Sequence, residues 1–144
     1  MLNRDGRRWL DELGVEMLKK MGIRPGHHVL DFGCGSGFYS LPAAMLVGDE
    51  GKVVALDKNR LKLKIVEKRA AERGITNIAI VQTTGNLSLP FPDATMDVVL
   101  LYDVLHKDFF DEGGREQLLT EIQRLVNYPG LKPEAYLGDW AGNP

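Results

Sequence analysis

The most informative stretch of this chain is Val29-Leu-Asp-Phe-Gly-Cys-Gly-Ser-Gly37. It opens as an apolar run of strand length (28–32) and stops at three glycines in alternate positions, after which apolar residues recur at helical spacing. Glycine has no Cβ, so Gly33, Gly35 and Gly37 allow a tight turn and a close approach to a ligand. N–H groups of such a loop and of the helix start point at the ligand. The stretch therefore predicts a strand, a ligand-binding loop and a helix.

Strands and helices alternate along the rest of the chain. The predicted strands, which are apolar or rich in β-branched residues, are 28–32, 52–56, 78–81, 97–101 and a short last run at 135–137. The predicted helices, marked by apolar residues at helical spacing, are 7–21, 38–47, 61–73 and 114–126. The segment 87–95 contains two prolines and is expected to be a loop. This order predicts an α/β fold: a Rossmann-like doubly wound sheet of about five parallel strands with helices on both faces.

The composition is ordinary for a globular protein. The 144 residues are 44% hydrophobic and 26% charged, with a formal charge of -2, and they suffice for one domain, spanning 1–144, with one core. No apolar run reaches the roughly 18 residues of a membrane span, and the charged N-terminus is unlike a signal peptide. Cys34 is the single cysteine, so an internal disulfide and a multi-cysteine metal site are excluded. We expect a cytoplasmic protein with no metal and no membrane partner.

The glycine spacing and two acids narrow the class of ligand. A dinucleotide loop reads G-x-G-x-x-G, whereas this loop reads G-x-G-x-G and follows Asp31. A carboxylate attracts a positively charged ligand and repels a pyrophosphate. Asp57 ends the second strand, 20 residues beyond Gly37, where it can accept hydrogen bonds from ribose hydroxyls. The alternatives are a ligand-free turn for the loop and a helix cap for Asp57.

Two stretches resemble the class I S-adenosylmethionine-dependent methyltransferases. Val29 to Gly37 is similar to the family's first motif, and Leu89-Pro-Phe-Pro-Asp-Ala-Thr-Met-Asp97 is similar to its passage into the fourth strand. The resemblance implies S-adenosylmethionine as the cofactor, with Asp31 near its amino group. Asn86 stands near the place where the family usually has an acid that holds the adenine amino group. The residues that the resemblance assigns to the cofactor are Asp31, Gly33, Cys34, Gly35, Gly37, Asp57, Lys58, Gly85, Asn86 and Tyr102.

The stretch after the fourth strand, Leu101-Tyr-Asp-Val-Leu-His106, is similar to a stretch of small-molecule methyltransferases that lies between methionine and acceptor. This implies a small-molecule methyl acceptor, with Tyr102 and Asp103 beside it. His106 is the candidate general base, since its unperturbed pKa of about 6.5 suits that role; a structural hydrogen bond is the alternative. Methyl transfer is an in-line displacement, which alignment of donor and acceptor can promote without a base.

Other functions are less well supported. The basic residues between 58 and 73 have no aromatic residues among them, which argues for a solvated helix face and against a nucleic-acid partner. The position of the third glycine and the carboxylate of Asp31 argue against a nicotinamide-dependent oxidoreductase. A catalytically inactive S-adenosylmethionine-binding protein is suggested by the short C-terminus.

The family fold ends in an antiparallel hairpin after the fifth strand, and too few residues follow 137 to form it. We therefore expect this final hairpin to be missing. A last strand without its neighbour exposes a sheet edge, which proteins normally cover. The expectation is a homodimer through the exposed edge or a shortened form of a longer chain.

Overall fold

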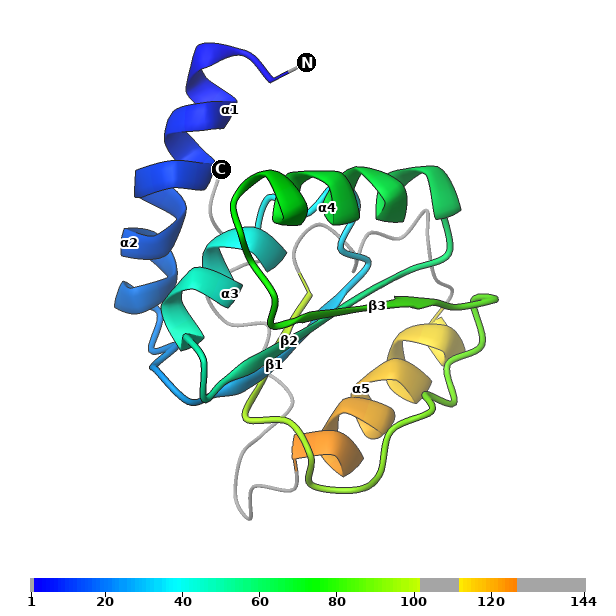
Figure 1. Ribbon diagram of the computed structural model, residues 1–144. Coiled ribbons are helices and arrows are strands. Elements are labelled where there is room, and N and C mark those ends of the chain that lie inside the picture. The colour runs from blue at the N-terminus through cyan, green and yellow to red at the C-terminus, as the bar shows by residue number, and fades with distance from the viewer. Residues whose placement is uncertain (1, 102–111, 127–144) are drawn as a thin grey trace.

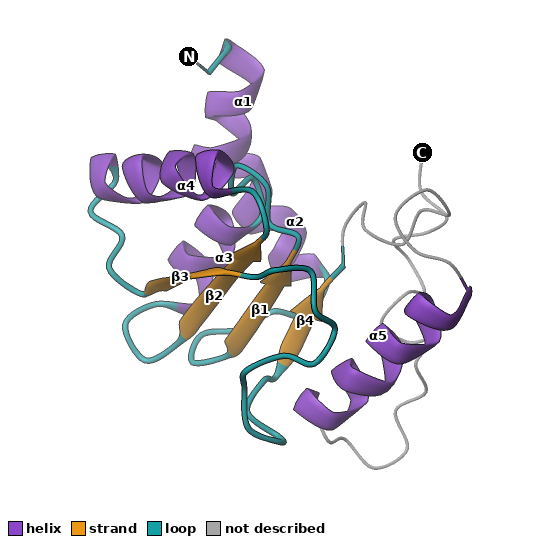
Figure 2. Ribbon diagram, turned by 90° about the vertical axis from the view of Figure 1, so that its right-hand side faces the viewer, coloured by secondary structure: helices purple, strands orange, loops and turns teal. Residues whose placement is uncertain are grey.

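A computed structural model describes residues 2–101 and 112–126. In these residues a sheet of four parallel strands forms, in the order β3-β2-β1-β4 (Figure 2). The strands are β1 His28–Phe32, β2 Lys52–Asp57, β3 Ile78–Gln82 and β4 Val98–Leu100. The parallel sheet is confirmed, and the strand order reverses between β1 and β4. The predicted fifth strand at 135–137 lies outside the described residues.

The helices fall on both faces of the sheet, as predicted. They are α1 Arg4–Arg8, the π-helical turn η1 Trp9–Leu13, α2 Gly14–Lys20, α3 Ser40–Val47, α4 Arg60–Glu72 and α5 Glu112–Val126. Figure 1 shows α3 and α4 on one face and α5 on the other. The predicted opening helix therefore starts three residues earlier than expected, and it contains a π turn that apolar spacing did not reveal. Among the described residues, no helix is long and apolar enough to cross a membrane.

The core has two layers because side chains of β1 alternate between the faces. Leu30 and Phe32 pack toward α5, where Ile122 is fully buried. Val29 packs on the other face, against residues of α2 and α3 such as Leu18. This alternation also turns Asp31 toward α3, on the same face as Val29.

The segment from Leu89 to Asp97 is held at both ends. The predicted loop 87–95 contains no helix or strand, and β4 is one residue shorter at each end than the predicted strand 97–101. The Arg124 guanidinium of α5 donates to the carbonyl oxygens of Leu89, at 3.1 Å, and Phe91, at 2.7 Å. At the other end the His28 backbone N–H donates to Asp97 Oδ2 at 2.7 Å, and the Asp97 N–H donates to the His28 carbonyl at 2.8 Å. These bonds fix the start of β4 beside the start of β1.

Candidate cofactor site at the glycine loop

The glycine loop leaves β1 at the carboxyl edge of the sheet, beside the reversal of strand order. Gly35 and Gly37 have φ angles of 54° and 86°, in the left-handed region that side chains disfavour. A Cβ at Gly37 would lie 3.1 Å from Val66 Cγ2 on α4, whereas a Cβ at Gly35 would meet nothing within 4 Å. Gly37 thus serves the packing of loop against helix, and Gly35 borders open space in which a ligand can approach the backbone.

Asp31 is a buried carboxylate at this loop. Its side chain is 2% exposed, and its Oδ2 accepts a hydrogen bond from Ser40 Oγ at 2.6 Å. The pKa of Asp31 is raised from an ordinary value of 3.8 to about 7, chiefly by burial; the hydrogen bonds from Ser40 oppose this rise, and the charge of Asp57 contributes to it. A positively charged ligand beside Asp31 would stabilise its ionised form.

Asp57 links the end of β2 to the loop. Its Oδ2 accepts from the Gly35 backbone N–H at 2.8 Å, and its Oδ1 accepts from the Asn59 N–H at 2.8 Å. The cap of α4 is Asn59, whose side chain accepts from the N–H groups of Leu61 and Lys62. The alternative of Asp57 as the helix cap is therefore wrong. Asp57 is instead placed against Gly35, on the loop that carries the predicted ligand site.

Cys34 and Lys58 differ in what they can do at the site. The Cys34 side chain is buried against Ala55 and Leu63. Burial and the nearby acids raise the pKa of its thiol, so the nucleophilic thiolate is disfavoured. The predicted role left for Cys34 is contact with the cofactor rather than catalysis. Lys58 is exposed, and its backbone carbonyl accepts from Gln82 Nε2 at 3.4 Å.

Gly85 and Asn86 lie in the loop that follows β3, at the same edge of the sheet as Asp57. Asn86 Oδ1 accepts from the Ser88 N–H at 2.9 Å, so this carbonyl oxygen already takes part in a local turn. Contact of Gly85 and Asn86 with adenine stays a prediction. Tyr102, Asp103 and His106 lie outside the described residues.

Sequence reasoning missed three residues that contact the loop or its acid. Ser40 holds Asp31, Trp9 Nε1 donates to the Phe38 carbonyl at 2.6 Å, and Arg69 Nη1 donates to the Ser36 carbonyl at 2.9 Å. Arg69 belongs to the basic run that was predicted to be a solvated face. No local signal marks these residues, because each bond depends on how separate elements pack.

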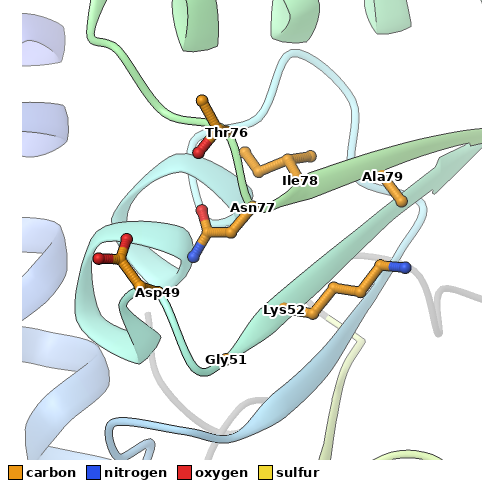
Figure 3. A pocket seen from close by; sticks show the side chains of 7 residues that line it. All are labelled: Asp49, Gly51, Lys52, Thr76, Asn77, Ile78 and Ala79. Atoms are coloured by element: carbon orange, nitrogen blue, oxygen red, sulfur yellow. The ribbon is translucent and has the colours of Figure 1, made fainter.

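A cavity of about 550 Å³ lies at the opposite edge of the sheet (Figure 3). Gly51 and Lys52 border it at the start of β2, and Asn77 borders it just before β3. The Asn77 side-chain amide donates to the carbonyls of Ala44 and Gly48, so it terminates α3. Ligands of parallel α/β sheets bind at the carboxyl ends of the strands. Because this cavity lies at the amino ends, it is not the candidate cofactor site.

Comparisons with known proteins show which family this chain belongs to. The methyltransferase domain family matches residues 29–130. Aklanonic acid methyltransferase DauC from Streptomyces sp. (strain C5) is 33% identical over 148 residues, covering 86% of this chain and 65% of that protein. A demethylmenaquinone methyltransferase from Anoxybacillus flavithermus (strain DSM 21510 / WK1) is 38% identical over 87 residues, covering 60% of this chain and 36% of that protein. This chain therefore spans less than two thirds of either relative.

A solved structure of a methyltransferase is also similar to this chain. The crystal structure of a SAM dependent methyltransferase from Aquifex aeolicus matches with a TM-score of 0.67 and 26% identity, covering 84% of this chain and 61% of that one. The alternation of strands and helices predicted the parallel sheet, and the stretch 29–37 that resembles the first motif of the family lies at the end of β1 and in the loop that follows it. The chain therefore belongs to the methyltransferase domain family, within the class I methyltransferases whose cofactor is S-adenosylmethionine.

Proposed function

We propose that this domain binds S-adenosylmethionine at the glycine loop and transfers its methyl group to a small-molecule acceptor. The observation that carries the proposal is the pair of carboxylates at the loop: Asp31, buried and held by Ser40, and Asp57, held against Gly35. Acids around an open glycine loop suit a ligand with an ammonium, a sulfonium and ribose hydroxyls.

Each of these residues would contact a different part of the cofactor. Asp31 would attract its ammonium group, directly or through water, and Asp57 would accept hydrogen bonds from its ribose hydroxyls. Gly35 would let the methionine part approach the backbone. The bound cofactor supplies a methyl carbon on a sulfonium, which the acceptor atom attacks as the carbon–sulfur bond breaks. His106 stays the candidate for removing a proton from the acceptor.

A small-molecule acceptor is supported by the relatives, which are named for aklanonic acid and demethylmenaquinone. We further propose a cytoplasmic location, supported by the single cysteine, which suits a reducing compartment. A homodimer through the sheet edge is the proposed assembly, because an edge strand presents unpaired backbone groups. Light scattering that finds a stable monomer would contradict the dimer.

Calorimetry with S-adenosylhomocysteine, S-adenosylmethionine and NAD tests the proposal. We expect both sulfur ligands to bind and NAD not to bind. Asp57→Ala should weaken binding at least tenfold, since it removes the acceptor for the ribose hydroxyls. Asp49→Asn is the matched control, because Asp49 lies at the opposite edge of the sheet.

Binding of NAD without either sulfur ligand would overturn the proposal in favour of an oxidoreductase. Transfer of a labelled methyl group from S-adenosylmethionine to candidate acceptors is the second measurement. It separates an enzyme from a protein that binds the cofactor without catalysis. Unchanged turnover in His106→Ala would rule out His106 as the general base.

A further inference from the structure

The second half of the glycine loop, residues 36–39, is held from outside by two distant side chains. Trp9 on the π turn donates from Nε1 to the Phe38 carbonyl at 2.6 Å. Arg69 on α4 donates from Nη1 to the Ser36 carbonyl at 2.9 Å. The Arg69 guanidinium also lies 5.1 Å from the centre of the Phe38 ring, within the range of a cation–π contact. Both side chains therefore act on one short piece of backbone.

This piece of backbone needs such support. Gly35 and Gly37 have positive φ angles, and glycine loses more conformational freedom on ordering than any other residue. Within the loop, the Gly37 N–H donates to the Cys34 carbonyl at 3.1 Å, which leaves the Ser36 and Phe38 carbonyls to Arg69 and Trp9. Because a peptide unit is planar, holding a carbonyl oxygen also fixes the direction of the next N–H. The two bonds thus select one shape of the loop.

The N-terminal helix is seated so that Trp9 reaches the loop. The π turn follows α1 at Trp9, and π turns occur often at functional sites. Gly14 lets the helix approach α3 closely, since a Cβ there would lie 2.6 Å from Pro42 Cγ. The Trp9 ring meets the Tyr39 ring edge to face, with 5.6 Å between their centres. The indole is therefore held by packing as well as by its hydrogen bond.

We infer that Trp9 and Arg69 are positioning residues for the cofactor: they hold residues 36–39 of the glycine loop in the shape that receives S-adenosylmethionine, which couples the N-terminal helix to cofactor binding. The inference rests on the proposed function. In this proposal each side chain acts on the cofactor site through its bond to a backbone carbonyl of the loop.

Two substitutions and a matched control test it. Trp9→Phe keeps an aromatic ring and removes the N–H donor, and Arg69→Met keeps most of the side-chain stem and removes the guanidinium. Lys68→Met is the control: Lys68 stands next to Arg69 on α4 and is exposed, so the variant removes a positive charge from the same helix. Calorimetry with S-adenosylhomocysteine should show binding about fivefold to tenfold weaker for Trp9→Phe and Arg69→Met. Lys68→Met should bind as the wild type does, and Arg69→Lys should recover part of the loss.

Hydrogen exchange of the ligand-free proteins supplies a second readout. In Trp9→Phe and Arg69→Met, amides of residues 33–39 should exchange faster, while amides of β1 and β2 keep their wild-type protection. Wild-type affinity in both variants would overturn the inference and leave the proposed function standing. Equal loss of protection in loop and strands would also overturn it, since the variants would then be destabilised as a whole. Failure of the wild type to bind S-adenosylhomocysteine would overturn the proposed function, and the inference with it.

Discussion

At the scale of the residue, the ionisation of Asp31 links cofactor binding to the free energy of folding. A carboxylate whose pKa is raised by burial resists ionisation, so the folded ligand-free protein binds a proton that the unfolded chain has lost. Its contribution to folding is fully present below the ordinary pKa of 3.8 and is lost as the pH rises toward about 7. The charge that the cofactor would use is thus formed at the expense of the free energy of folding.

Asp31→Asn should remove this dependence on pH. Between pH 5 and pH 8 we expect the wild type to lose about 2 to 3 kcal/mol of unfolding free energy that the variant does not lose. Urea denaturation of both ligand-free proteins at the two pH values measures the difference. The comparison is between the changes in unfolding free energy with pH, so a constant cost of the new amide does not affect it. Parallel pH profiles would show that Asp31 ionises as an ordinary exposed acid.

The neighbouring glycines should respond differently to alanine. Gly37→Ala places a Cβ 3.1 Å from Val66 on α4, at a φ of 86°, and should cost about 1 to 3 kcal/mol of stability. Gly35→Ala meets no atom within 4 Å, at a φ of 54°, and should cost about 1 kcal/mol while reducing cofactor binding at least tenfold. Thermal melting and calorimetry on both variants check this. Equal losses of stability and of binding in the two variants would contradict it.

At the scale of the element, α4 illustrates the division between local and distant interactions. Asn59 caps its start, and Gly74, with a φ of 65°, ends it. Both residues act within a few positions of the helix. The face of α4 that meets the sheet buries Leu63 and Val66, and Arg69 reaches from the same helix to the glycine loop. A single helix therefore combines a local cap with a contact to the candidate site.

Asn59→Ala should destabilise the protein by about 1 kcal/mol, because two N–H groups at the start of α4 lose their acceptor. Asn59→Asp keeps an acceptor oxygen and should retain most of the stability. Chemical denaturation of the three proteins measures the effect. A larger loss in Asn59→Asp than in Asn59→Ala would show that repulsion from Asp57 outweighs the cap.

At the scale of the whole molecule, α5 ties the far face of the sheet to the segment before β4. Arg124 bonds the carbonyls of Leu89 and Phe91 and pairs with Asp93 and Glu121. Its guanidinium lowers the pKa of Glu121, so this pair contributes stability that is lost as the pH falls through that lowered value. The segment ends at the amino edge of the sheet, where Asp97 bonds His28 at the start of β1.

Arg124→Met should lower the melting temperature and leave the affinity for S-adenosylhomocysteine unchanged, since the bonds that it removes lie far from the loop. Arg115→Met, on the same helix, is the control for loss of a positive charge. Calorimetry and thermal melting at neutral pH measure both quantities. Loss of affinity beyond that of the control would mean that the segment before β4 supports the cofactor site.

Local patterns in the sequence were enough to predict the order of the elements, the glycine loop after β1 and the acid at the end of β2. Strand and helix periods, glycines and strand ends are local properties, so spacing along the chain reveals them. The packing of separate elements accounts for the bond from Ser40 to Asp31 and for the bond from Arg69 to the Ser36 carbonyl of the loop, in place of the solvated role predicted for Arg69. Burial and contacts between elements set these outcomes, as in the bond from Trp9 to Phe38, whose partners stand 29 residues apart in the chain. No periodicity encodes such a distance.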